Sequence, residues 1–106
     1  WGALDRGKPI GTAGHLACFS LQQAKHVTCG DGGIVASGDA RFGPLLQRFG
    51  DKGMDRIGGG GLIDALATNY RMSELQAGFA AAQLERLEGI AAKRAAAGNA
   101  FNAALE

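Results

Sequence analysis

One lysine lies where an apolar run gives way to a glycine-rich turn. Lys25 is found in FSLQQAKHVTCGDGG, residues 19–33, five positions after Ser20. An amine attacks a carbonyl only when deprotonated, so such a lysine needs desolvation or a nearby positive charge to lower its pKa. The run before it, residues 13–21, is apolar enough for a buried strand, and α/β folds build their sites at strand ends. These residues allow Lys25 to carry a Schiff base, and they also allow an exposed lysine without a chemical role, which is the commoner case.

The residues after the lysine predict a hairpin and a helix. In CGDGG, residues 29–33, Asp31 followed by Gly32 suits a tight turn with positive φ. GIVA, residues 33–36, then reads as the returning strand. Asp39 suits the N-cap of a helix over residues 40–49, whose apolar side chains recur at helical spacing. Residues 1–12 are predicted to be an irregular connection, and residues 50–68 a loop.

A long helical pattern occupies the last third of the chain. Ser73 and Gln76 have the spacing of a capping box, and residues 74–105 are dominated by good helix formers. We expect one face to be traced by apolar side chains, namely Leu75, Phe79, Ala82, Leu84, Leu87 and Ala91. Gly89 and Gly98 weaken the pattern, so a kink or break is expected near one of them.

Composition excludes several classes of function. With 106 residues, a net charge of +1 and 46% hydrophobic residues, the chain has the composition of a globular protein of at most one ordinary domain. Its basic residues are scattered, which argues against nucleic-acid binding. Two cysteines are too few for a four-ligand zinc site, so no metal is expected. No apolar run approaches a bilayer's thickness, so we expect a cytoplasmic protein without a membrane segment. We interpret the chain as a piece of a longer protein.

Two segments in fixed order carry a family resemblance. FSLQQAKHVTCGDGGIVAS, at residues 19–37, is followed by the FGDKG stretch and then by ATNYRMSELQAGFAAAQLERLEGIAAKR, at residues 67–94. From about Gly11 to Arg94 the chain closely resembles the DegT/DnrJ/EryC1/StrS family of sugar aminotransferases, which use pyridoxal 5'-phosphate (PLP). Each piece alone is weak, and together they are specific.

The resemblance implies roles for four residues. Lys25 sits where the family has the lysine that forms the internal aldimine with PLP and then moves the substrate proton. Ser20 matches the serine that holds the cofactor phosphate. Asn69 matches the asparagine that reaches across a dimer interface to the neighbouring subunit's cofactor phosphate, and Arg71 is a further candidate for substrate binding. Taken alone, Ser20 also suits a strand hydroxyl bonded to backbone, and Asn69 a turn residue. His15 and His26 are interpreted as noncatalytic.

The resemblance also implies a fold and an activity. We expect an α/β chain, part of the large domain of a fold-type I PLP-dependent transferase. Residues 1–72 would be the later part of that domain, and residues 73–106 a long helix leading toward a small domain. The full-length protein would be a homodimer with a shared active site, moving an amino group from glutamate or glutamine to a nucleotide-linked keto-sugar or a keto-cyclitol.

Some features depart from the family pattern or lie outside the chain. Between Ser20 and Lys25 the sequence is Leu-Gln-Gln-Ala, where many members of the family have a histidine or an aromatic residue. The family's aspartate that pairs with the pyridine nitrogen is expected before Trp1. An alternative of a different class is a noncatalytic fragment that self-associates through its long amphipathic helix.

Overall fold

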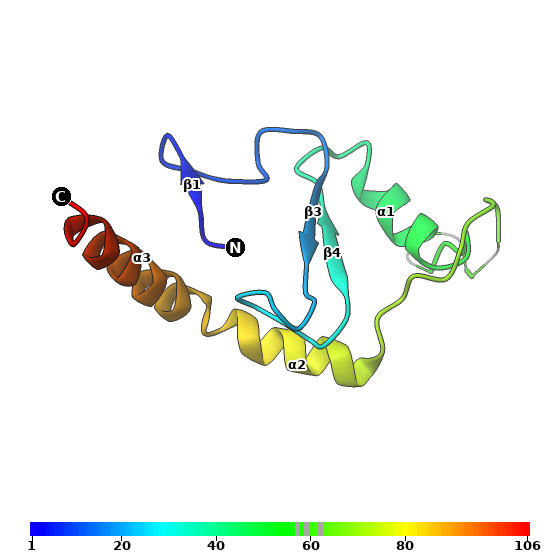
Figure 1. Cartoon of the computed structure of the whole chain (residues 1–106). Helices are drawn as coiled ribbons and strands as arrows, with labels where there is room; N and C mark the ends of the chain where they lie inside the picture. The colour runs from blue at the N-terminus through cyan, green and yellow to red at the C-terminus, as the bar shows by residue number, and fades with distance from the viewer. Residues whose placement is uncertain (57, 59, 62) are drawn as a thin grey trace.

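The computed structural model, shown in Figure 1, describes residues 1–56, 58, 60–61 and 63–106. Four short strands come first: β1 (Leu4–Asp5), β2 (Lys8–Pro9), β3 (Ala17–Ser20) and β4 (Gly33–Ala36). Three helices follow: α1 (Gly43–Gly50), α2 (Glu74–Leu84) and α3 (Leu87–Ala103). Figure 1 shows the β3–β4 pair in the middle, with α1 on one side and α2 running past the end where the Lys25 loop emerges.

The central β3–β4 pair is antiparallel, which confirms the predicted returning strand. Its register runs from Ala17 opposite Ala36 to Ser20 opposite Gly33. Strand β3 begins at residue 17, whereas the apolar run that predicted it begins at residue 13. Its partner ends at Ala36, and beyond that point the hydroxyl of Ser37 donates to the carbonyl oxygen of His15 at 2.7 Å in place of ladder bonds.

The predicted Asp31–Gly32 tight turn is wrong. The connection between β3 and β4 is the twelve-residue Lys25 loop, defined here as residues 21–32, and its positive φ of 90° is at Gly30. Gly32 is needed for a different reason. A Cβ there would lie 2.7 Å from Cys29 Sγ and 3.2 Å from Met72 Cε, so any other residue would have to displace these two side chains.

The first twelve residues contain a small hairpin that the sequence analysis missed. β1 and β2 pair antiparallel around Arg6 and Gly7, which have φ of 49° and 78°. Two successive residues with positive φ are typical of the tight hairpin turn that matches strand twist. The signal was the Arg6–Gly7 pair, which is less distinctive than Asn-Gly or Asp-Gly.

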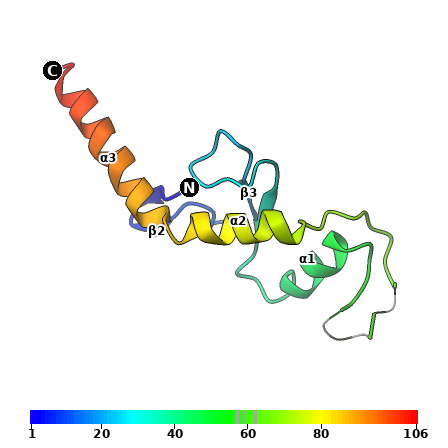
Figure 2. The same cartoon turned by 90° about the horizontal axis from the view of Figure 1, so that it is seen from below.

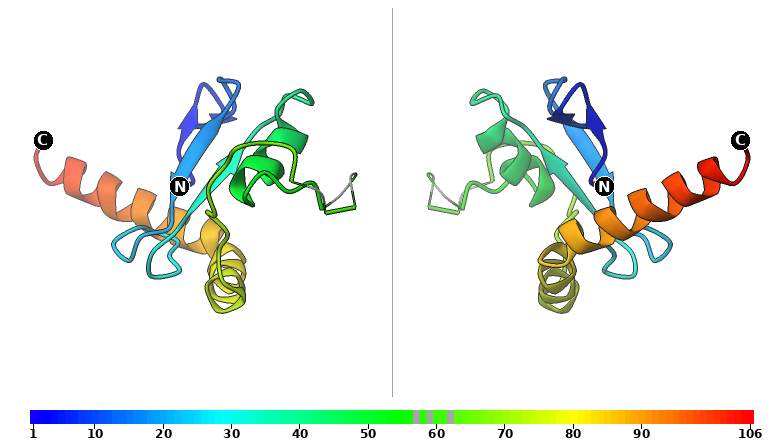
Figure 3. Two further views of the ribbon diagram at one scale, coloured as in Figure 1. Left: turned by 90° about the vertical axis from the view of Figure 1, so that its right-hand side faces the viewer. Right: turned by 90° about the vertical axis from the view of Figure 1, so that its left-hand side faces the viewer.

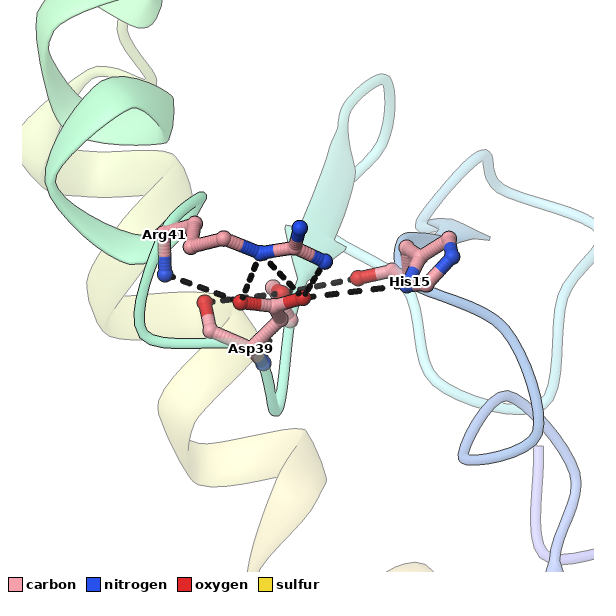
Figure 4. A network of polar contacts seen from close by, with 4 residues as sticks. His15, Asp39 and Arg41 are labelled. Carbon is pink, nitrogen blue, oxygen red and sulfur yellow. Dashed lines mark hydrogen bonds and ion pairs between the residues drawn. The ribbon is translucent and has the colours of Figure 1, made fainter.

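Helix α1 starts at Gly43, three residues later than predicted. Asp39 closes the preceding turn, because its carboxylate accepts from the Arg41 backbone N–H at 2.9 Å and its carbonyl accepts from Phe42 N at 3.0 Å. Pro44 then falls in the first helical turn, where its missing N–H costs nothing. Figure 4 shows the Asp39 carboxylate between Arg41 and His15, whose Nδ1 is 3.7 Å away, so this turn is tied to the segment before β3.

The predicted capping box is present, and the predicted long helix is divided in two. Ser73 Oγ accepts from Gln76 N at 3.3 Å, and Gln76 Oε1 accepts from Ser73 N at 3.1 Å. The break lies at Glu85–Arg86, where Arg86 N bonds Gln83 O three residues back and the tighter turn redirects the chain. Figure 2 shows α2 and α3 running in different directions. Gly89 and Gly98 both lie inside α3.

The buried core is small and is formed mainly by the Lys25 loop packed on α2. Among the described residues it contains Leu21, Val27 and Cys29 of the loop and Ala80 of α2. Leu84 and Leu87 pack against this core, whereas Leu75 and Phe79 are 88% and 54% exposed. Residue 84 is five positions after residue 79, about 140° around a helix. The single apolar face predicted along residues 75–91 is therefore wrong, because its members divide between opposite sides.

The chain is elongated. Its radius of gyration is 17.2 Å, against about 13 Å for a compact domain of this length. Its accessible surface is 7983 Å², about 2,400 Å² more than expected for a compact protein of this mass. In both views of Figure 3, α3 extends away from the strands. Much of the apolar surface is thus available for contact with other polypeptide.

Replacing the cap of α2 tests how its first turn is held. Ser73→Ala removes the side-chain acceptor of the Gln76 N–H and should destabilise that turn by about 1 kcal/mol. Amide hydrogen exchange of residues 76–78 in the complete protein should then be roughly fivefold faster. Ser73→Asp keeps an acceptor and should exchange at nearly the wild-type rate. Equal exchange in Ser73→Ala and wild type would show that the cap contributes nothing.

Candidate functional site

The Lys25 loop is held at its base by Leu21. The Leu21 N–H donates to Gly32 O at 2.8 Å, and its carbonyl accepts from Cys29 N and Thr28 Oγ1, both at 3.0 Å. The Leu21 side chain is fully buried, as is that of Val27. These contacts fix both ends of the segment that carries the lysine.

Lys25 itself lies on an exposed turn at the outer part of this loop. Its N–H donates to Gln22 O at 2.9 Å, and Gln22 Oε1 accepts from Ala24 N at 2.8 Å. The side chain of Gln22 therefore shapes the turn that presents the amine. This role was missed because a glutamine at this place in the sequence has no distinctive signal.

Ser20 ends β3 directly before the loop. Its Oγ accepts from the Gln22 N–H at 3.3 Å, so its hydroxyl proton remains available to an acceptor. Its carbonyl accepts from Trp1 Nε1 at 2.9 Å, and the Trp1 and Phe19 rings lie 4.9 Å apart between centroids. The backbone is thereby fixed on one side while the hydroxyl stays exposed.

The side chain of His26 follows Lys25 in the loop. Desolvation, the positive charge of Arg94 and other nearby cations lower the pKa of its imidazole below the ordinary value. The interpretation of His26 as noncatalytic stays a prediction.

Asn69 and Arg71 form a second group, attached to the end of α1. Asn69 Oδ1 accepts from Arg71 Nε at 3.2 Å. Asp51 forms an antiparallel bridge with Asn69, flanked by backbone bonds from Lys52 N to Thr68 O and from Tyr70 N to Gly50 O, both 2.9 Å. The segment that carries the two predicted residues is thus laid along residues 50–52.

One buried carboxylate organises this second group. Asp51 is 3% exposed, and it contacts Lys52 Nζ at 2.6 Å, Arg71 Nε at 3.0 Å and Arg56 Nε. We refer to Asp51, Lys52, Arg56 and Arg71 as the Asp51 cluster. The contact with Lys52, followed by that with Arg56, lowers the pKa of Asp51 to about 2. Sequence reasoning missed Asp51, because Asp-Lys-Gly after a helix looks like an ordinary exposed turn.

Gly53 permits the sharp return of the chain at this cluster. Its φ is 78°, and a Cβ there would collide with the carbonyl of Ala65. Glycine is required on both counts. The FGDKG stretch therefore combines a buried acid at residue 51 with a backbone position that tolerates no side chain.

The two groups of predicted residues are joined by Gln76. Its Oε1 belongs to the cap of α2, and its Nε2 donates to Asp31 O at 2.8 Å at the end of the Lys25 loop. Met72 also packs against the core that this loop forms with α2. Ser20 and Lys25 are thereby held near the segment of Asn69 and Arg71, although no contact between the two pairs is present among the described residues.

An apolar cavity of about 1140 Å³ opens between the β3–β4 pair and α1. Its lining includes Phe19, Ser20, Ile34, Leu46, Phe49 and Tyr70. Of the four predicted residues, Ser20 lines this cavity, and the described lining includes neither Lys25, Asn69 nor Arg71. The exposed amine, hydroxyl and amide are suited to covalent attachment and phosphate binding.

Two further features bear on the kinds of site available. Within residues 1–56, 58, 60–61 and 63–106, no three His, Cys, Asp or Glu side chains gather as they would around a metal ion. Over the same residues, every helix is too short or too polar to cross a bilayer.

Comparison with known proteins gives a consistent result. A sequence model of the DegT/DnrJ/EryC1/StrS aminotransferase family matches residues 1–106. A Streptomyces kanamyceticus protein with the provisional name L-glutamine:3-amino-2,3-dideoxy-scyllo-inosose aminotransferase is 34% identical over 101 residues, which are 94% of this chain and 24% of that protein. An aminotransferase of Psychrobacter cryohalolentis, solved by X-ray methods, superposes with a TM-score of 0.66 at 29% identity, covering 74% of this chain and 22% of that one. The chain thus spans about a quarter of the length of these relatives.

The Asp51 cluster should come apart at low pH. A carboxylate whose pKa is depressed on folding stabilises the fold above its unfolded pKa, and this contribution is lost as pH falls from about 4 toward 2. Asp51→Asn should therefore lower the melting temperature of the complete protein by a few degrees at pH 7. The difference from wild type should shrink below pH 4.

The matched control for this prediction is Asp5→Asn, because Asp5 is exposed in β1. Asp5→Asn should leave the melting temperature unchanged at both pH 7 and pH 2. A difference between Asp51→Asn and wild type that is as large at pH 2 as at pH 7 would show that the carboxylate charge is not what holds the cluster.

Proposed function

Because the chain belongs to the DegT/DnrJ/EryC1/StrS aminotransferase family, we propose that the complete protein is a PLP-dependent aminotransferase in which Lys25 binds the cofactor. The observation that carries the proposal is the Lys25 loop. Buried Leu21 and Val27 close it on both sides of an exposed amine, and Ser20 lies at its start with a hydroxyl proton to donate. A covalent anchor needs this combination of a fixed backbone and an accessible nitrogen.

The residues present fit the cofactor. PLP supplies an electron sink for carbanion chemistry at an amino acid or ketone carbon. The Lys25 amine would attach the cofactor, and when released would accept and return the substrate proton. The Ser20 hydroxyl would donate to the cofactor phosphate without adding charge. Gln22 would keep the lysine turn in place, since its backbone and side chain both bond that turn.

Asn69 and Arg71 are proposed to serve the active site of a partner subunit. Both are exposed, and the Asp51 cluster holds their segment along the end of α1. The Asn69 side chain would donate to the phosphate of the partner's cofactor, and Arg71 would face its substrate. The exposed Leu75 and Phe79 on the following helix offer apolar surface for the dimer contact.

The name of one relative supports a proposal for the acceptor and the donor. The S. kanamyceticus relative is named for L-glutamine as the donor and for an inosose as the other reactant. We propose transfer from glutamine or glutamate to a cyclic ketone, either a keto-cyclitol or a nucleotide-linked keto-sugar. The protein would work in the cytoplasm.

We propose a domain boundary between residues 72 and 73. Residues 1–72 would be the later part of the large, PLP-binding domain. Residues 73–106 would lead toward a small domain as two helices, with a change of direction at Glu85–Arg86.

Removing the amine should abolish transamination. Lys25→Ala in the complete protein should lower kcat by roughly a hundredfold to ten-thousandfold, because it removes the group that transfers the proton. Lys93→Ala, an exposed lysine on α3, is the control and should keep wild-type activity. A Lys25→Ala protein that turns over at the wild-type rate would refute the assignment of Lys25.

A shared active site predicts recovery when two inactive variants are mixed. Each shared site would take Lys25 from one subunit and Asn69 from the other. A heterodimer of Lys25→Ala and Asn69→Ala subunits therefore has both changes in one site and neither in the second, which stays intact. After complete subunit exchange, about a quarter of wild-type activity should return, since half of randomly paired dimers are heterodimers. No recovery despite proven exchange would place Asn69 and Lys25 in the same subunit's site.

A further inference from the structure

Arg56 and Arg71 both contact the Asp51 carboxylate, and each does so through its Nε. The Nε of each guanidinium contacts Asp51, and Arg71 Nε also donates to Asn69 Oδ1 at 3.2 Å. Neither terminal nitrogen of either arginine has a partner among the described residues. The two side chains are about half exposed, 51% for Arg56 and 50% for Arg71.

The other ion-paired arginines are bound differently. Arg41 donates to the Asp39 carboxylate through both Nε and Nη2, at 2.6 to 3.1 Å (Figure 4). Arg48 uses Nη2 on Asp55 at 2.7 Å and Nη1 on Asp64 at 3.1 Å. Carboxylates of the chain itself thus engage one terminal nitrogen of Arg41 and both terminal nitrogens of Arg48. Arg56 and Arg71 instead keep the part of the guanidinium that binds oxyanions in a fork.

These two arginines line a common pocket. It has a volume of about 460 Å³ at the end of α1, and its polar lining consists of Gln47, Asp51, Arg56, Tyr70 and Arg71. Two positive charges and one negative charge give this lining a net charge of +1. Lys52, also paired with Asp51, adds another positive charge nearby. Asp51 would repel an anion, but three cations surround it and its side chain is almost fully buried.

We propose that this pocket binds an oxyanion carried by a reactant, with Arg56 and Arg71 as a paired clamp and Asp51 as the residue that positions both. Whether the reactant takes part in transamination rests on the proposed function. The shared chemistry is a carboxylate or a phosphate, each of which accepts two parallel N–H bonds from a guanidinium. One source is the carboxylate of the amino-acid donor, and the other is the phosphate of a nucleotide-linked acceptor.

Titration with inorganic phosphate tests the clamp without requiring turnover. The complete, cofactor-loaded protein is used, so that the cofactor phosphate already fills its own site. Arg56→Gln should weaken phosphate binding roughly tenfold to a hundredfold, as expected for losing charge-assisted hydrogen bonds. Arg56→Lys keeps the positive charge but lacks the forked guanidinium, so its phosphate affinity should lie between those of wild type and Arg56→Gln. Arg41→Gln is the control, because Arg41 pairs with Asp39 and neither residue is among those lining this pocket, and it should bind as wild type does.

Two results of the titration would overturn the clamp. One is equal phosphate affinity in wild type and Arg56→Gln. The other is an equal loss in Arg56→Gln and Arg41→Gln, which would indicate a general charge effect. Because Arg56 is half exposed, we expect its variants to fold, and unchanged helical circular dichroism checks this.

Steady-state kinetics then identifies the source of the oxyanion. With Arg56→Gln, a raised KM for the amino donor identifies its carboxylate, and a raised KM for a nucleotide-linked acceptor identifies its phosphate. Unchanged KM for both would refute the link to a reactant. If the protein shows no transamination at all, the proposed function fails, whereas the phosphate titration still decides whether the clamp exists.

Discussion

The structure depends on the closure of the Lys25 loop by Leu21. One residue supplies the backbone donor that ends the β3–β4 ladder, the carbonyl that accepts twice from the returning chain, and a side chain with no exposed surface. Twelve residues connect these strands, and an unpinned connection of that length would sample many conformations. Because Leu21 is buried with Val27 against Ala80, the loop's position is coupled to helix α2. The exposed lysine is therefore carried by a fixed frame.

A second joint, at Asp51, does for the Asn69 segment what Leu21 does for the lysine. Here the fixing force is electrostatic, because a nearly buried carboxylate must be paired and three cations surround it. Gln76 links the two joints through its bond to Asp31. The site thus has a hydrophobic half that presents an amine and an ionic half that presents an amide and guanidinium groups.

Sequence patterns predicted the parts of this fold that depend on neighbouring residues. The Ser73 cap and the strand at residues 33–36 were correct because each depends on local spacing. The errors arose where distant contacts decide the outcome. The positive φ is at Gly30, and Gly32 packs against Cys29 and Met72, which are contacts that the local pattern does not show. The helical pattern breaks at Glu85–Arg86, whereas the sequence placed a kink or break near Gly89 or Gly98. The role of Asp51 became visible only once the fold brought residues 51, 56 and 71 together. The roles of Lys25, Ser20 and Asn69 came from the family resemblance and remain predictions.

The central claim, that Lys25 is the residue that holds the cofactor, is tested most directly by chemical trapping. The complete protein is loaded with PLP, reduced with borohydride, digested and mapped by mass spectrometry. We expect the cofactor's added mass on the peptide containing Lys25, at close to one per subunit. Addition of that mass to a different lysine, with the Lys25 peptide unmodified, would contradict it.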